Sequence, residues 1–361
     1  MHVLFCNWRD TRNPEGGGSE RYVEEMARGL VERGHQVTIA CAAHDAAPRD
    51  EVRDGVRFVR RGSKLDIYAT TFLRLLTRRY GKVDVVVDVQ NGLPFFTRLA
   101  TRKPVVVLVH HVHREQWPVV YPGLTGRIGW WIESRLAPRL YRRSRYVCVS
   151  DATRLELIDL GVDRDRIAVV HNGTDPAPVV DARRSPTPRL CVLGRLVPHK
   201  QVEHAIDALA AVRVGHPEAT LDVVGDGWWG DELRAYAAQQ GVADAVTFHG
   251  FVDDRTKHEI LARSWLMLLP SLKEGWGIVV GEAGSHATPT IAYSTAGGTT
   301  ESIDHKDSGL LVDDREQLVT ETVDVVEDTE WRTFLGEGAL AKANAYSWDT
   351  SRAAFARELG A

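Results

Sequence analysis

Short apolar runs alternate with amphipathic segments along almost the whole chain, and this alternation constrains the fold more than any other feature. Residues 83–89 and 104–109, for example, consist mainly of valine. Such runs are typical of parallel strands buried on both faces of a sheet, and parallel strands need crossover segments between them. The alternation restarts after residues 176–188, a stretch rich in proline, alanine and arginine that we interpret as a linker. The 361 residues therefore predict an α/β fold with two doubly wound, Rossmann-like domains, at 1–176 and 177–345.

Composition indicates a protein of a reducing compartment. The four cysteines lie far apart, mostly in apolar runs, and form no metal-binding spacing, so we expect buried free thiols. No apolar run is long enough to span a membrane, and the N-terminus leads directly into a strand-like run. We therefore expect no signal peptide and a cytoplasmic location. Residues 1–175 carry a net charge of +7 and the remainder −11, which favours an anionic partner for the first domain only.

A glycine-rich loop joins the first predicted strand, 3–7, to a helix at 20–33. Gly16, Gly17 and Gly18 stand where the loop meets the helix, and glycine there allows the backbone to approach a bound group such as phosphate. The spacing is not that of a dinucleotide site, and no acid ends the following strand, 36–41, to bind an adenosine ribose. A nicotinamide cofactor is therefore disfavoured, and a flexible surface loop is the alternative.

Three histidines follow the strand at 104–109. Ligands of open α/β sheets bind at the carboxyl ends of strands, so His110 is well placed to contact a substrate. His111 is the alternative, one residue further on, and His113 is expected in a loop. A metal site is the competing interpretation, but no cluster of carboxylates or cysteines completes a ligand set.

The segment 124–146 combines tryptophans with many arginines and only one acid, Glu133. One interpretation is a surface helix that touches anionic headgroups, with tryptophans at the interface. The other is a solvated helix whose tryptophans belong to the core. A second basic run, 74–80, resembles the first. The solvated helix is the favoured interpretation, and peripheral contact of the basic first domain with an anionic membrane is the hypothesis beside it. We find no module for nucleic acid and expect no such partner.

The second half contains two further turns with charged residues. Gly194 opens a turn before a helix, and this turn carries Arg195 and Lys200. Two fixed positive groups at such a place would neutralise a diphosphate and stabilise it as a leaving group. Later, a strand at 265–269 leads through a glycine-containing loop into another helix, the arrangement of an anion site.

Two acids flank this last helix start. Glu274 lies in the loop and Glu282 within the expected helix, with seven residues between them. Carboxylates suit sugar hydroxyls better than phosphate, because they accept hydrogen bonds and carry negative charge. The alternative is an ordinary strand-loop-helix unit with two surface glutamates.

Together these motifs resemble a retaining glycosyltransferase of family 4, with the two-domain GT-B fold. The resemblance covers nearly the whole chain and is strongest from residue 190 to 312. It rests on the motifs named above and on the segments 224–227, 248–251, 288–289 and 297–301. Two departures stand out, because Gly281 replaces a usual bulky apolar residue and the segment 284–287 is atypical. Both put helix packing in question more than the chemistry.

The resemblance implies roles for individual residues. Glu274, His110, Arg195 and Lys200 would form the catalytic set, with Glu274 near the reaction centre and Glu282 on the ribose hydroxyls. The helix at about 346–361 would cross back onto the first domain. The donor site would lie between the domains. It would consist of Gly17, Gly18, Arg195, Lys200, Gly227, Phe251, Glu274, Gly275, Trp276, Gly277, Ile278 and Glu282.

The expected reaction moves a sugar from a nucleotide diphosphate sugar to an acceptor hydroxyl, on a lipid-linked acceptor or a cell-envelope glycan. No Asp-x-Asp motif stands in a suitable loop, and the basic pair can do the work of a metal on the phosphates, so we predict no metal and no cofactor. Retention of configuration is implied by the resemblance alone. A sugar phosphorylase, a nucleotide-sugar epimerase and a non-catalytic nucleotide-sugar-binding subunit are the alternatives, because fold does not fix function. The sequence does not identify the donor base or sugar.

Overall fold

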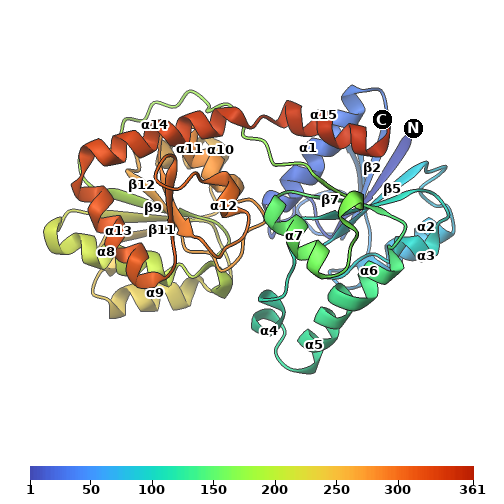
Figure 1. The fold of residues 1–361 in the computed structure, drawn as a ribbon, viewed down its shortest axis with the longest axis horizontal. Coiled ribbons are helices and arrows are strands. Elements are labelled where there is room, and N and C mark those ends of the chain that lie inside the picture. The colour runs from blue at the N-terminus through green and yellow to red at the C-terminus, as the bar shows by residue number, and fades with distance from the viewer. The chain divides into compact units, whose positions relative to one another are not determined.

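The computed structural model describes residues 1–361 and divides into two compact units (Figure 1). Unit 1 comprises Met1–Asn172 together with Trp348–Ala361, and unit 2 comprises Gly173–Ser347. The chain thus leaves unit 1 four residues before the predicted boundary at 176/177 and returns to it for its last fourteen residues. Each unit holds one sheet covered by helices on both faces, which confirms the predicted α/β class.

Unit 1 is built on an eight-stranded sheet of order β3-β4-β2-β1-β5-β6-β7-β8. All neighbouring strands are parallel except β3 and β4, which form an antiparallel hairpin at the edge. This hairpin was not predicted, although its turn has the Asp54-Gly55 pair that favours a tight two-residue loop. The strands are β1 (His2–Cys6), β2 (Gln36–Cys41), β3 (Asp50–Arg53), β4 (Val56–Arg60), β5 (Val85–Gln90), β6 (Val105–Val109), β7 (Arg145–Cys148) and β8 (Ile167–Val169).

The helices of unit 1 cover both faces of this sheet. Helix α15 lies against α1 on one face, where Phe355 stacks on Phe5 of the central strand at 5.9 Å between ring centroids (Figure 1). On the other face, Tyr141 belongs to the same buried cluster as Leu4 and Cys6. The helices are α1 (Gly18–Glu32), α2 (Asp66–Leu76), α3 (Thr97–Ala100), α4 (Gln116–Val120), α5 (Leu124–Trp131), the π-helix η1 (Ile132–Leu136), α6 (Ala137–Leu140), α7 (Asp151–Asp159), the 3₁₀-helix η2 (Arg164–Arg166) and α15 (Trp348–Leu359).

Unit 2 is built on a six-stranded, fully parallel sheet of order β11-β10-β9-β12-β13-β14. Two buried clusters, one on each face, pack the helices against it. The strands are β9 (Arg189–Leu193), β10 (Thr220–Val224), β11 (Val246–Gly250), β12 (Leu266–Leu269), β13 (Thr290–Tyr293) and β14 (Gly309–Val312). The helices are η3 (Pro198–Lys200), α8 (Glu203–Gly215), α9 (Gly230–Gln239), η4 (Ala243–Ala245), α10 (Asp254–Arg263), α11 (Ile278–Gly284), α12 (Thr299–Ser302), α13 (Arg315–Glu327) and α14 (Thr329–Ala345).

The predicted linker is only partly a free connection. Its last residues are fixed to the rest of unit 2, because Arg184 donates hydrogen bonds to the carbonyls of His286 and Ala287 at 2.8 and 2.9 Å. The neighbouring Ser185 accepts a hydrogen bond from the indole of Trp265 at 2.7 Å. A segment without apolar periodicity can therefore still be fixed, because arginine reaches backbone carbonyls that no local pattern reveals.

The cysteine prediction is confirmed, since all four cysteines are free and buried. Burial raises the pKa of the Cys6 thiol well above its usual value, with a further contribution from the nearby Asp88, and such a thiol is unreactive. Among the helices of the chain, none combines the length and the apolar character needed to cross a bilayer.

Candidate active site

The strand order of unit 2 places its candidate site. The chain starts the sheet at the central strand β9, builds outward through β10 and β11, and then returns to the other side of β9 with β12. The loops after β9 and β12 therefore diverge at the carboxyl edge of the sheet, and this switch point is where doubly wound sheets bind ligands. These two loops carry Arg195, Lys200 and Glu274.

Backbone contacts join the loops at this edge into one surface. The N–H of Leu272 donates to the carbonyl of His199 at 2.9 Å, which links the loop after β12 to the loop after β9. The N–H of Glu274 donates to Ala296 at 2.7 Å, and the carbonyl of Glu274 accepts from Gly298 at 3.0 Å, which adds the loop after β13. The position of Glu274 is thus set by main-chain hydrogen bonds on both sides.

Glycines permit this close approach of backbones. A Cβ at Gly298 would lie 1.9 Å from the carbonyl oxygen of Gly275, and a Cβ at Gly227 would lie 2.2 Å from that of Leu196. Gly277, the residue that precedes α11, has φ +82°, a conformation that other residues rarely adopt. The predicted donor residues Gly227 and Gly277 therefore shape the loops, and Gly298 allows the backbone at Gly275 to approach closely.

Lys200 and Glu274 form an ion pair across the switch point. Both side chains are mostly buried, at 18% and 13% exposure, so water screens their attraction less than at an open surface. Arg195 lies in the same loop as Lys200 and is exposed. Two of the three predicted catalytic groups of unit 2 are thus in contact, a positive charge beside a carboxylate.

The second acid of the pair, Glu282, also holds a lysine. Its carboxylate lies 2.7 Å from Nζ of Lys257 on α10, and the same Nζ lies 3.0 Å from Asp254. Burial acts to lower the pKa of Lys257, but the carboxylates of Glu282 and Asp254 outweigh it and raise that pKa. Lys257 was not predicted, because its ion pair with Glu282 joins two helices and no sequence motif connects them.

The N-terminus of helix α11 contributes less positive charge to the site than expected. It has seven residues, so only a short row of peptide dipoles points at its N-terminus. Ile278, its first residue, is half-buried. The positive charge at this edge therefore comes chiefly from the lysine and arginine side chains. Phe251, which was predicted to lie near the nucleotide base, has a side chain that is 82% exposed.

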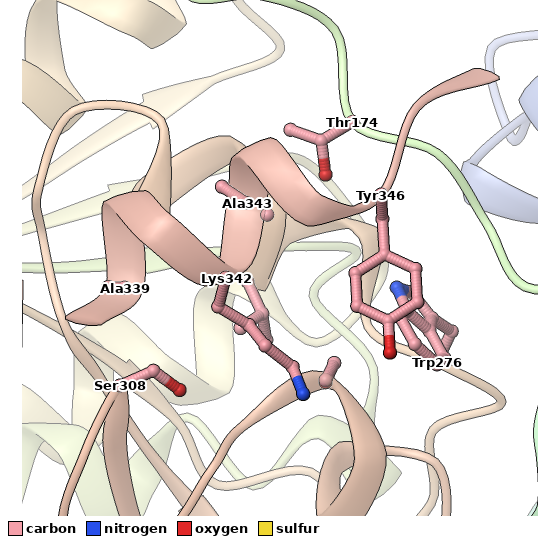
Figure 2. Close-up of a pocket in the computed structure, with 10 residues that line it drawn as sticks. Thr174, Trp276, Ser308, Ala339, Lys342, Ala343 and Tyr346 are labelled. Atoms are coloured by element: carbon pink, nitrogen blue, oxygen red, sulfur yellow. The ribbon is translucent and has the colours of Figure 1, made fainter. Parts of the chain in front are cut away.

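Trp276 lies behind the loop, turned toward the back of α11. Its ring is buried and packs edge-to-face on Tyr346 at 4.9 Å between centroids (Figure 2). The pocket beside these rings, which Lys342 also lines, holds about 10 Å³ of free volume. That is room for about one water molecule and no more, so Trp276 supports the loop and this pocket is not a substrate site.

In unit 1 the start of α1 is held by its own acid. Glu20 accepts hydrogen bonds from the N–H of Gly17 at 2.8 Å and from the hydroxyl of Ser19 at 2.9 Å. The predicted phosphate contact through Gly17 would therefore compete with Glu20, while Gly18 is the first residue of the helix. Gly16 is the sterically required glycine, since a Cβ there would lie 2.7 Å from the carbonyl of Asp10.

His110 follows β6 and is buried against α1. Its ring packs edge-to-face on Tyr22 at 5.4 Å, and its Nε2 has no hydrogen-bond partner. Burial lowers its pKa to about 4, although Glu20 acts to raise it. His110 is thus a neutral imidazole at ordinary pH with one ring nitrogen free, whereas the alternative, His111, is hydrogen-bonded to Gln116 at 3.1 Å.

Comparison with known proteins identifies the family. The family model described as "Glycosyltransferase Family 4" matches residues 16–178, and the one described as "Glycosyl transferases group 1" matches residues 179–341. The D-inositol 3-phosphate glycosyltransferase of Jonesia denitrificans is 30% identical over 93% of this chain and 89% of its own length. The chain belongs to glycosyltransferase family 4.

Other relatives agree with this assignment. The GDP-mannose-dependent α-(1-6)-phosphatidylinositol monomannoside mannosyltransferase of Mycobacterium tuberculosis is 29% identical over 95% of this chain and 94% of its own length. The structure of Anabaena HepE with UDP and glucose superposes with a TM-score of 0.75 at 22% identity, over 100% of this chain and 99% of that chain. WaaG, a glycosyltransferase of lipopolysaccharide biosynthesis, gives a TM-score of 0.78 at 18% identity, over 99% and 100%. These structures confirm the GT-B fold, and the glycosyltransferase is an enzyme of the hexosyltransferase type that takes its sugar from a nucleotide sugar.

Proposed function

We propose that this glycosyltransferase transfers a hexose from a nucleoside diphosphate sugar with retention of configuration and without a metal ion. The acceptor is a hydroxyl of a lipid-linked molecule or a cell-envelope glycan, presented at the inner face of a membrane. The observation that carries the proposal is the Lys200–Glu274 ion pair at the switch point of unit 2. It places a cation suited to a diphosphate directly beside a carboxylate suited to a sugar.

Each side chain then has a distinct task. Lys200 and Arg195 take up the negative charge that grows on the phosphate as the bond from the anomeric carbon to the phosphate oxygen breaks. Glu274 accepts hydrogen bonds from sugar hydroxyls and fixes the ring. The acceptor oxygen forms the new bond to the anomeric carbon on the same face, and its proton passes to the leaving phosphate. The products are the glycosylated acceptor and the nucleoside diphosphate, and no protein nucleophile takes part.

His110 and Glu282 complete the proposed donor contacts. A neutral imidazole can donate or accept one hydrogen bond through its free Nε2, so it suits a hydroxyl of the transferred sugar. Glu282, oriented by Lys257, suits the ribose hydroxyls. The names of the relatives make GDP-mannose the donor to test first, and UDP-glucose second.

Two substitutions separate the roles of the ion pair. Lys200→Ala should weaken binding of the nucleoside diphosphate by about tenfold or more, because a charge-assisted contact to phosphate is lost. Glu274→Ala should abolish transfer but leave that binding largely intact. Binding is measured by the thermal shift with GDP, UDP and their sugar conjugates, and transfer by release of the nucleoside diphosphate.

Arg263→Ala is the matched control. It removes one exposed positive charge at the last residue of α10, and the helices of such a sheet end at the edge opposite the switch point. It should leave binding and transfer unchanged. Equal loss of nucleotide binding in the Lys200 and Glu274 variants would contradict the assigned roles, and absence of a shift with every nucleotide would reject the donor site.

A further inference from the structure

Helices α4 and α5 form a projecting hairpin on unit 1 (Figure 1), which we call the α4–α5 hairpin and define as residues 116–131. It displays six large apolar side chains that are between 39% and 70% exposed. Large exposed apolar side chains gathered on one projecting element mark an interaction site. The six residues are Val119, Val120, Tyr121, Leu124, Ile128 and Trp131.

The hairpin is locked together by one tryptophan. The ring of Trp117 fills a notch in α5, where a Cβ at Gly129 would lie 2.3 Å from it. Gly126 meets the backbone of the same turn, since a Cβ there would lie 2.2 Å from the carbonyl of Tyr121. The indole N–H of Trp117 also donates to Glu133 at 2.6 Å. The inner side chains are thus used for packing, and the apolar side chains that remain are presented as a fixed set.

The outward-facing stripe of α5 combines apolar side chains with a positively charged one. Leu124, Ile128 and Trp131 follow helical spacing, and the exposed Arg127 lies on the same stripe. Trp130, in contrast, packs against the core of unit 1. The two tryptophans of this segment therefore differ, since Trp130 packs on the core and its neighbour Trp131 is exposed. The single helix expected at 124–146 is divided by the π-helix η1.

The charge around the apolar face has one sign. Residues 117–150 contain six arginines, and Glu133 is their only acid. Glu133 is buried and is hydrogen-bonded by Trp117 and by the N–H of His113, so its charge does not face outward. The arginines that follow α5 are exposed: Arg135, Arg139, Arg142, Arg143 and Arg145, the last of which pairs with Glu358 of α15 at 2.8 Å.

We propose that the α4–α5 hairpin docks this enzyme on an anionic phospholipid surface. The apolar side chains enter the region between headgroups and acyl chains, with Trp131 at the interface, and the arginines bind lipid phosphates. An excess of exposed arginine over residues 117–150, where the one acid is buried, is complementary to such a surface and would repel a second copy of the same face. The inference rests on the proposed function and deepens it, because it names the surface that brings the enzyme to a membrane-held acceptor.

The test is sedimentation of the full-length protein with vesicles, without donor or acceptor. Wild type should bind vesicles of phosphatidylcholine mixed with phosphatidylglycerol, bind pure phosphatidylcholine much more weakly, and lose binding as salt is raised. Two double variants, Ile128→Ser with Trp131→Ser and Arg127→Gln with Arg135→Gln, should each weaken binding by about tenfold or more. Leu155→Ser and Trp228→Ser remove apolar side chains of similar exposure on α7 and in unit 2, and should leave binding unchanged.

Several outcomes would overturn the proposal. Wild type that ignores anionic vesicles at low salt would reject it, and so would hairpin variants that bind as tightly as wild type. A dimer in light scattering that the hairpin variants abolish would assign the surface to a second copy instead. The thermal shift with the nucleotide that binds wild type reports on folding and on the donor site in every variant. Vesicle binding that persists while the Lys200 and Glu274 tests fail would reject the proposed function alone.

Discussion

At the scale of single residues, the burial of His110 predicts a measurable pH dependence of the free energy of unfolding. Its pKa is lowered to about 4, first by burial and also by His113, whereas an unfolded chain would have a value near 6.5. Between these two values the unfolded chain binds a proton that the folded chain does not. The contribution of His110 to stability is therefore complete above about pH 6.5 and is lost as the pH falls toward 4.

We expect His110→Gln to flatten this part of the pH profile. The free energy of unfolding of wild type should fall by up to about 3 kcal/mol more than that of the variant between pH 6.5 and 4. Urea denaturation at a series of pH values measures the difference, with His35→Gln, at a half-buried position in the loop between α1 and β2, as the control. Parallel profiles for wild type and His110→Gln would show that the imidazole is not held neutral by the fold.

The residues that sequence could and could not identify differ in a physical way. Lys200 and Glu274 lie in loops whose glycines and charges form recognisable spacings, and the structure brings them together. Lys257 leaves no such signal, because it meets Glu282 only when α10 and α11 pack side by side. Gly16 was noted as one of three similar glycines, and only the turn around Asp10 shows why it is the constrained one.

At the scale of elements, the unusual Gly281 is explained by its neighbour in space. A Cβ at Gly281 would lie 2.2 Å from Oγ1 of Thr174, on the segment that has just entered unit 2 (Figure 2). The N–H of Thr174 donates to the carbonyl of Tyr346 at 2.9 Å, so the entering and leaving segments lie side by side there. Gly284 meets α14 in the same way, 2.6 Å from the carbonyl of Ala339. The departures from the family pattern are therefore packing adaptations on the back of α11.

This packing predicts a strong coupling between Gly281 and Thr174. Gly281→Ala alone should destabilise unit 2 by about 1–3 kcal/mol, because the new methyl group overlaps the threonine side chain. In a Thr174→Ala background the same change should be nearly neutral or gain up to about 1 kcal/mol, since alanine favours the helix. Denaturation of the four proteins of this double-mutant cycle measures the coupling, and additive effects would contradict the contact.

The elements themselves were largely predictable where the apolar pattern was strong. The strands predicted at 3–7, 36–41, 83–89, 104–109 and 265–269 were found within two residues, the usual uncertainty of element ends, because each is a short apolar run. The hairpin β3–β4 was missed because β3 is polar and half-exposed at the sheet edge, so it shows no apolar run. The break of the arginine-rich helix at η1 was missed because the apolar and basic residues continue through it.

At the scale of the whole molecule, the chain crosses between two units that each have their own buried cores. Unit 1 is completed by the last helix, α15, whose Arg352 lies 2.5 Å from Glu25 of α1. A Cβ at Gly29 of α1 would lie 2.5 Å from Cβ of Arg352, so the two helices approach closely. Unit 1 is therefore built from two separate segments of the chain and is complete only when α15 has packed onto it, whereas unit 2 is one continuous segment.

Calorimetry should resolve this organisation, because multidomain proteins commonly depart from two-state unfolding. Phe355→Ala removes a fully buried ring of α15 and should destabilise unit 1 by about 3–5 kcal/mol. Leu335→Ala, which is buried in the core of unit 2, should cost that unit about 2–5 kcal/mol. Each substitution should lower the midpoint of one transition and leave the other in place.

A nucleoside diphosphate assigns the two transitions. If the donor site is built on unit 2, the nucleotide should raise the midpoint that Leu335→Ala lowers, and Phe355→Ala should leave that shift intact. A single transition that both substitutions lower equally would instead show that the units unfold together. In that case α15 would control the stability of the donor-binding unit as well as its own.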